Sequence, residues 1–321
     1  MRNSTLDVYK IIACFLVIFI HSHVVCTGDV YWVAIARMAV PVFFMISGYY
    51  YSSIIQMGKE RHYFNKIVRL TLTFTILYGL LGFRHLGSVI GLENLTNWLL
   101  FNDLPFGGHL WYLYALIYVL LIVRFVPQLI GSTKSAYISV ILFVFNIILS
   151  YNMETLYYRN FLFTGLPYFL LGDFLNTKRV SVQRHSNTVY ILGTLFLLLF
   201  LIAEYKFNMK YGFVTIKDHY VMLYPLCIVL FSFAIKNPNF NRNGKLSSCG
   251  KKYSTDIYLY HFIFVSFCQN VLMLLTCNGI VKSMQHNLLF PISVFLLTLG
   301  TSYILKNRVP VIEKIKRTFY F

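Results

Sequence analysis

The sequence predicts an all-α protein, a polytopic membrane bundle of about ten transmembrane helices with both termini in the cytoplasm. Hydrophobic residues make up 58% of the 321 residues and charged residues only 12%, at a mean hydropathy of +0.64. So little polar side-chain area could not cover the surface of a soluble domain of this size. Apolar runs of about 17–25 residues, the length that crosses a bilayer as a helix, recur along the whole chain.

The apolar runs define the expected elements. In chain order, the candidate spans are residues 8–27, 31–55, 67–86, 110–126, 135–150, 160–176, 187–205, 219–235, 254–277 and 287–305. The first run contains His21 and no small-x-small cleavage site, so we interpret it as a retained span and not as a signal peptide. An even number of spans leaves both termini on one side. Because several runs are short, nine or eleven spans also fit.

Topology explains the net charge of +17. With the N-terminus inside, 21 lysines and arginines fall in cytoplasmic segments or the adjoining helix ends, as the positive-inside rule requires. Arg37 lies within the second span, and six basic residues fall on the other side: Arg84, Arg159, Lys206, Lys210, Lys217 and Lys282. No RNP-like, zinc-finger or helix-turn-helix signature accompanies this charge, so we expect no nucleic-acid partner.

The connectors are short, and we predict a single domain over residues 1–321. The 87–109 connector contains an amphipathic piece, Asn94 to Phe101, which is either a helix on the outer surface or a plain connector. The six cysteines show no C-x-x-C spacing, so no metal site is expected. Cys26 and Cys277 both fall near outer ends of spans, where two unpaired thiols are favoured over a disulfide.

An ionisable stripe runs along the first span. At about 100° per residue, the eleven steps from Lys10 to His21 return to nearly the same helical face, roughly 16 Å along the axis. Asp7 lies one turn below Lys10. Ionisable groups are costly in lipid, so such a stripe indicates a pathway or a reactive site.

Six segments together carry a resemblance to a known family. They are LDVYKIIACFLVIFIH, RMAVPVFFMISGYYYS, FNKIVRL, HLWYLYAL, FLLGDFL and DIYLYHFIF. In order and spacing they resemble the membrane acyltransferase-3 family, enzymes that mostly O-acetylate cell-surface glycans, over about residues 5 to 300. The family usually has Arg where this chain has Lys10, and commonly Gly where it has Ile11. Lysine keeps the charge but lacks the planar fork of arginine, which argues against a bidentate role at this position.

The resemblance implies a catalytic role for His21. A neutral imidazole has the basicity that acyl transfer from a thioester to a sugar hydroxyl needs. His21 then either deprotonates the acceptor hydroxyl or receives the acetyl group itself, and Lys10 and Asp7 orient or tune it. A buried histidine that only bonds a neighbouring helix is the plainer alternative.

The resemblance also implies a site for acetyl-CoA as the acyl donor. Lys66 and Arg69 are three residues apart, hence on one helical face, and match a basic pair that the family associates with acyl-CoA binding. Arginine and lysine suit the phosphates of coenzyme A. Ser47 and Gly48 form either a close helix contact or a narrow slot for the pantetheine arm.

Four further residues are candidates for binding the acceptor. Arg37 needs a partner or an aqueous cavity within the membrane, so it either forms an ion pair or contacts the acceptor or the thioester oxygen. His109 and Trp111 suit an acceptor site, although an interfacial aromatic belt also explains the tryptophan. His261 in the ninth span is either a helix-packing or a catalytic histidine.

Together with these residues, the resemblance implies an O-acetyltransferase of the bacterial inner membrane. It would transfer acetyl from cytoplasmic acetyl-CoA to a hydroxyl of a cell-surface polysaccharide or its lipid-linked precursor, without a metal. Two alternatives remain at this stage. One is a transporter or exporter of a glycan or small molecule, whose permeation route the stripe would line. The other is an amino-acid uptake module like the similar domains fused to racemases, although this sequence has no such soluble domain.

Overall fold

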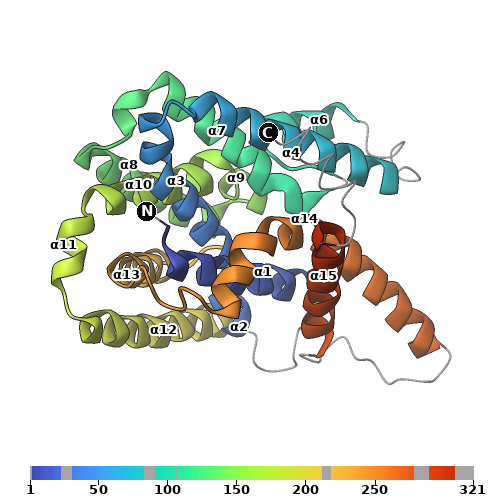
Figure 1. Cartoon of the computed structure of the whole chain (residues 1–321). Helices are drawn as coiled ribbons and strands as arrows, with labels where there is room; N and C mark the ends of the chain where they lie inside the picture. The colour runs from blue at the N-terminus through green and yellow to red at the C-terminus, as the bar shows by residue number, and fades with distance from the viewer. Residues whose placement is uncertain are drawn as a thin grey trace.

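The computed structural model describes residues 2–22, 31–82, 91–105, 107–211, 218–277 and 289–307. Over these residues the chain is a bundle of helices without strands (Figure 1). The α-helices are α1 Ser4–His21, α2 Tyr31–Ala36, α3 Ala39–Gln56, α4 Glu60–Leu81, α6 Leu92–Phe101, α7 Trp111–Phe125, α8 Thr133–Asn152, α9 Thr155–Tyr158, α10 Leu166–Thr177, α11 Arg179–Arg184, α12 Asn187–Lys210, α13 Leu223–Lys236, α14 Lys245–Cys277 and α15 Leu289–Asn307. This confirms the predicted all-α class.

Within the described ranges, eight segments are long and apolar enough to cross a membrane. The predicted spans 160–176 and 219–235 correspond to shorter helices. Phe161–Gly165 is a π-helical turn that leads into the 12 residues of α10, and α13 has 14 residues. The count of ten and the side of the termini therefore stay predictions.

Helix α1 begins at a side-chain cap and lies near the middle of the bundle (Figure 1). The Asn3 side chain accepts the backbone N–H of Leu6 at 3.1 Å, which satisfies one of the free donors of the first turn. Along its length α1 packs on α14. At Gly250 of α14 an added Cβ would lie 1.8 Å from the backbone oxygen of Asp7, so this approach requires glycine.

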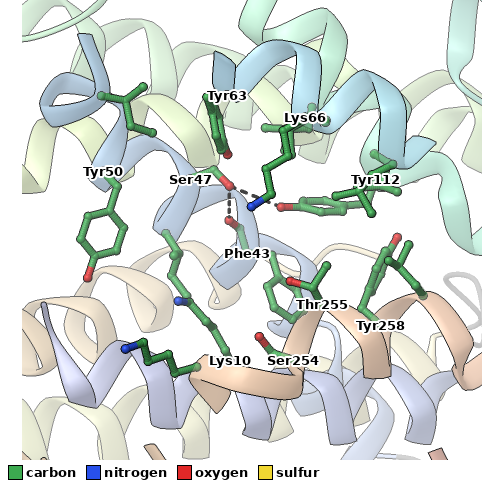
Figure 2. Close-up of a pocket in the computed structure, with 18 residues that line it drawn as sticks. Lys10, Phe43, Ser47, Tyr50, Tyr63, Lys66, Tyr112, Ser254, Thr255 and Tyr258 are labelled. Atoms are coloured by element: carbon green, nitrogen blue, oxygen red, sulfur yellow. Dashed lines mark hydrogen bonds between the residues drawn. The ribbon is translucent and has the colours of Figure 1, made fainter. Parts of the chain in front are cut away.

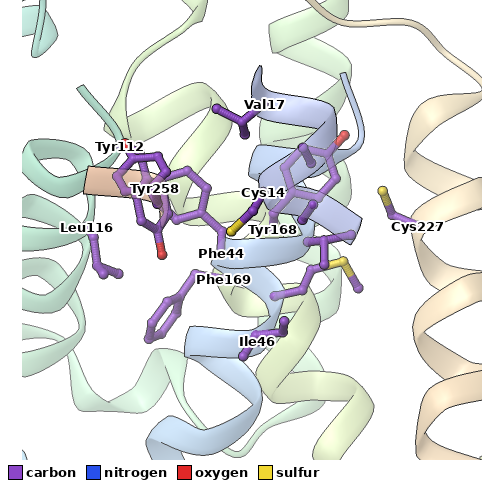
Figure 3. Close-up of a cluster of buried hydrophobic side chains, with 14 of the residues drawn as sticks. Cys14, Val17, Phe44, Ile46, Tyr112, Leu116, Tyr168, Phe169, Cys227 and Tyr258 are labelled. Carbon is purple, nitrogen blue, oxygen red and sulfur yellow. The ribbon is translucent and has the colours of Figure 1, made fainter. Parts of the chain in front are cut away.

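Helices α3 and α10 approach closely through a reciprocal pair of glycines. A Cβ on Gly48 would lie 1.9 Å from the Phe169 backbone oxygen, and one on Gly172 would lie 2.0 Å from that of Met45. Small residues allow this contact between membrane helices. The surrounding core includes Phe44, Tyr168 and Phe169, all fully buried (Figure 3). Gly48 is thus part of the helix contact that was one of its two predicted roles.

The predicted amphipathic piece is helical. Helix α6 spans Leu92–Phe101, has no buried residue, and packs Trp98 against Tyr114 with ring centroids 5.7 Å apart. It ends at Asn102, whose φ of 66° is left-handed. That α6 lies on a membrane surface remains a prediction.

Four cysteines in the described part of the chain are free: Cys14, Cys227, Cys249 and Cys268. Cys26 and the side chain of Cys277 lie outside the described residues, so their pairing does too.

Candidate functional site

A cavity of about 330 Å³ opens between α1, α3, α4, α7 and α14 (Figure 2). Its polar lining includes three lysines, and we call it the lysine cavity. Polar side chains that line it include Lys10, Ser47, Lys66, Tyr112, Lys251 and Tyr258. The other walls are largely aromatic and aliphatic. A concave, mostly apolar site with a few convergent polar groups is typical of a ligand site.

Lys10 is held at this cavity by the buried carboxylate of Asp7. Its Nζ lies 3.0 Å from Asp7 Oδ1, and Arg2 Nε lies 2.7 Å from Asp7 Oδ2. The side chain of Asp7 is only 6% exposed, whereas that of Lys10 is 26% exposed. The predicted neighbours Asp7 and Lys10 are therefore an ion pair, with the ammonium at the cavity and the carboxylate beneath it.

Ser47 and Gly48 lie on different faces of α3. The Ser47 hydroxyl donates to the Phe43 backbone oxygen at 3.0 Å and lies 3.4 Å from the Tyr112 hydroxyl, at the lysine cavity (Figure 2). Gly48, in contrast, faces the Phe169 backbone. Of this predicted pair, the structure brings only Ser47 to the cavity.

Only one member of the predicted basic pair on α4, Lys66 and Arg69, lines this cavity. Lys66 lines the lysine cavity together with Tyr63, Ile67 and Leu70 from the same helical face. Arg69 is exposed and is not among the residues that line it. Lys251, which the sequence did not single out, adds a third ammonium group from α14.

Three histidines from three elements meet deeper in the bundle. His21 ends α1, His109 sits in the 3-10 turn Gly108–Leu110 that precedes α7, and His261 lies within α14. Ring centroids are 5.4 Å apart for His21 and His261, and 5.3 Å apart for His109 and His261. His109 and His261 are buried. These residues were predicted separately, and the structure brings them together; we call them the histidine cluster.

A second, smaller cavity of about 50 Å³ lies against His21. Its charged residues are Arg37, Arg159 and Asp218, and we call it the arginine cavity. Arg37 pairs with Asp218, and Arg159 Nη1 lies 3.6 Å from the other oxygen of that carboxylate. Burial raises the pKa of Asp218, but the two guanidinium groups outweigh it and hold the pKa below its usual value.

Trp111 and His219 also line the arginine cavity. The Arg159 guanidinium lies 5.8 Å from the centre of the Trp111 ring, within the range of a cation–π contact. His219 Nε2 is 3.0 Å from the hydroxyl of Thr164, which the π-helical turn before α10 presents. Of the four predicted acceptor residues, Arg37 and Trp111 line this cavity, whereas His109 and His261 belong to the histidine cluster.

Asp218, His219 and Arg159 were not predicted as site residues. A signal for Asp218 was present, because an intramembrane Arg37 demands a counter-ion and few acidic residues lie near the same predicted depth. Nothing in the local sequence distinguishes Arg159 or His219 from ordinary polar residues at helix ends.

The histidine cluster lies between the two cavities. Tyr258 lines the lysine cavity, its ring centroid lies 5.9 Å from that of His261, and its hydroxyl donates to the backbone oxygen of His109. His21 lines the arginine cavity. Among the described residues, no group of three His, Cys, Asp or Glu side chains is arranged to hold a metal ion. The arrangement places imidazole side chains, which can act as bases, between the lysine cavity and the arginine cavity.

Comparison with known proteins gives one match. The model of a family described as an acyltransferase domain, acyltransferase-3, matches residues 3–306, almost the whole chain. No curated protein and no solved structure matches the chain.

Proposed function

The chain belongs to the acyltransferase-3 family whose model it matches, and on that premise we propose that it is an O-acetyltransferase. It transfers the acetyl group of acetyl-CoA to a hydroxyl of a cell-surface polysaccharide or its lipid-linked precursor. The observation that carries the proposal is the position of the histidine cluster between the lysine cavity and the arginine cavity.

The lysine cavity suits the donor. Its volume of about 330 Å³ is at the small end of ligand sites, so it suits the pantetheine arm and the thioester. Lys66 and Lys251 are exposed and can contact the phosphates of the nucleotide outside the cavity. The hydroxyls of Ser47 and Tyr112, 3.4 Å apart at the cavity, are suited to hydrogen-bond the amides of the arm.

The arginine cavity suits the acceptor. Its volume of about 50 Å³ admits one hydroxyl-bearing edge of a sugar, while the rest of the glycan stays outside. Because His21 lines this cavity and not the lysine cavity, we assign it the role of general base for the acceptor hydroxyl. The direct route, with the hydroxyl oxygen attacking the thioester carbon, follows from that position.

The two cavities lie toward opposite ends of α1. Lys10 and His21 are eleven residues apart on this helix, which corresponds to roughly 16 Å. With the predicted topology, in the bacterial inner membrane, the donor would enter from the cytoplasm and the acceptor from the other side.

Acetyl-CoA titration of detergent-purified protein tests the donor site. Lys66→Ala should weaken binding about tenfold, since a charge-assisted contact is worth about 1.5–3 kcal/mol and the exposed lysine falls at the low end. Lys59→Ala is the matched control, because Lys59 is also an exposed lysine near the start of α4 but does not line the cavity. Arg69→Ala shows whether the donor also reaches the second member of the predicted pair.

The same titration separates the proposal from its alternatives. Folded wild-type protein that binds no acetyl-CoA, yet moves a glycan or an amino acid across vesicles, would be a transporter or an uptake module. If Lys66→Ala binds acetyl-CoA with unchanged affinity, the assignment of Lys66 to the donor site is wrong.

A further inference from the structure

His261 is fully buried, and its hydrogen bond determines which ring nitrogen carries the proton. Nδ1 lies 2.6 Å from the backbone oxygen of Tyr258. A carbonyl oxygen can only accept, so Nδ1 donates, and the lone pair of the neutral ring is on Nε2. Nε2 is buried and has no hydrogen-bond partner among the described residues. A buried acceptor without a donor is unfavourable, so this nitrogen is suited to a partner met during function.

Two imidazoles lie within reach of this nitrogen, and His21 is the one that also lines a cavity. The centroid of its ring lies 5.4 Å from that of His261, with the two planes at 38°. Hydrogen bonds between catalytic groups are often long before substrate binds and tighten in the complex. His109 lies equally near, at 5.3 Å, but it stacks on Phe262 and lines neither cavity, and within the described residues neither of its ring nitrogens has a hydrogen-bond partner.

We propose that His261 is a positioning residue for His21 in the acyl transfer proposed above, on which this inference rests. Its Nε2 accepts the ring N–H of His21. The other ring nitrogen of His21 is then the unprotonated one, on a ring that lines the arginine cavity. A chain of hydrogen bonds then runs from the Tyr258 carbonyl through the imidazoles of His261 and His21 to the acceptor hydroxyl.

The transfer step balances with this arrangement. The acceptor O–H bond breaks, its proton moves to His21, and the oxygen forms a bond to the acyl carbon. The C–S bond of the thioester breaks, and its electron pair leaves with the sulfur. The thiolate takes the proton from His21 and becomes the thiol of coenzyme A. While His21 is charged, the hydrogen bond to His261 stabilises it, and His261 keeps its own bond to Tyr258.

Two amide substitutions, each of which replaces one of the two ring nitrogens, separate this role from helix packing. His261→Asn keeps an N–H donor near the position of Nδ1 but removes the acceptor at Nε2. His261→Gln keeps an acceptor near the position of Nε2 but loses the donor to Tyr258. A purely structural histidine needs the first group, whereas a positioning histidine needs the second.

The experiment measures kcat and the KM for acetyl-CoA, with the surface-glycan fraction of the source cells as acceptor. We expect His261→Asn to lower kcat about 100-fold or more, the low end of general-base contributions, with KM within about twofold of wild type. His261→Gln should retain at least about ten times the kcat of His261→Asn. Equal rates, the reverse order, or an active His261→Asn would overturn the proposal. His185→Asn, in a connector outside both cavities, is the matched control.

A second comparison covers the case in which His261→Asn does not fold. In a His21→Asn background, adding His261→Gln should change the residual rate less than about twofold, because His261 acts only through His21. A further tenfold fall would show that His261 acts independently of His21. If wild-type protein transfers no acetyl group at all, the proposed function fails; if it is active and the variants do not follow the expected order, only this inference fails.

Discussion

The role of each ionisable side chain in this bundle depends on the partner with which it forms an ion pair. The pairing of Lys10 with Asp7 was predictable, since residues three apart on a helix are neighbours. The pairing of Arg37 with Asp218 was indicated only by their similar predicted depth, because it joins segments far apart in the sequence and only tertiary packing brings them together. The sequence therefore predicted that Arg37 needs a partner, but not which one.

Two roles of Lys10 can be separated: the ion pair with Asp7 and the proposed contact with acetyl-CoA at the lysine cavity. Lys10→Arg should be tolerated because it keeps the charge beside Asp7, whereas Lys10→Ala should raise the KM for acetyl-CoA about tenfold, equivalent to about 1.4 kcal/mol. Arg2→Ala is the control, since Arg2 pairs with the same carboxylate but does not line the lysine cavity. Equal effects of the two alanine variants would reduce Lys10 to a counter-ion of Asp7.

Arg37 and Asp218 test the two predicted roles of the arginine. Asp218→Asn should destabilise the protein by about 3–5 kcal/mol, because it leaves a largely buried guanidinium without its nearest counter-ion. The double variant Arg37→Leu, Asp218→Leu should recover stability in a thermal unfolding assay. If the double variant is also fully active, Arg37 serves only the ion pair; lost activity in a stable protein assigns it to the acceptor.

At the scale of elements, hydropathy located the helices but not their ends. Helices α4 and α14 begin before their predicted spans because polar first turns, ERHY and KLSS, continue the helix beyond the apolar run. The predicted span 160–176 begins instead with a π-helical turn capped by Asn160. Hydropathy reports composition and cannot distinguish a π turn from an α turn.

The glycine contact between α3 and α10 predicts a strong effect of one methyl group. Gly172→Ala should lower stability by about 1–3 kcal/mol, because its Cβ would lie 2.0 Å from a backbone oxygen and the helices must separate. Gly300→Ala in α15 is the matched control, because no atom of the described residues lies within 4 Å of the added Cβ. Thermal unfolding in detergent checks both, and similar melting temperatures would mean that α3 and α10 are not in close contact.

At the scale of the whole molecule, the sequence predicted the membrane bundle and the family but not the cavities. The three histidines stood in three separate motifs, and the sequence did not show that His21, His109 and His261 meet. Lys251 carried no signal, because topology alone produces basic residues near cytoplasmic helix ends, and nothing in the local sequence distinguished Arg159. Assembling a site from five helices depends on crossing geometry, which a single sequence does not specify.

The most direct test of the central claim is a sidedness assay in sealed vesicles that hold the purified protein in one known orientation. Isotope-labelled acetyl-CoA is enclosed on the side of the lysine cavity, and the glycan fraction is supplied on the side of the arginine cavity. We predict that base-labile label appears on the glycan, and that His21→Ala abolishes it in protein that still inserts and purifies normally. Transfer only when both substrates share one side, or near-normal transfer by His21→Ala, would contradict acyl transfer through the histidine cluster.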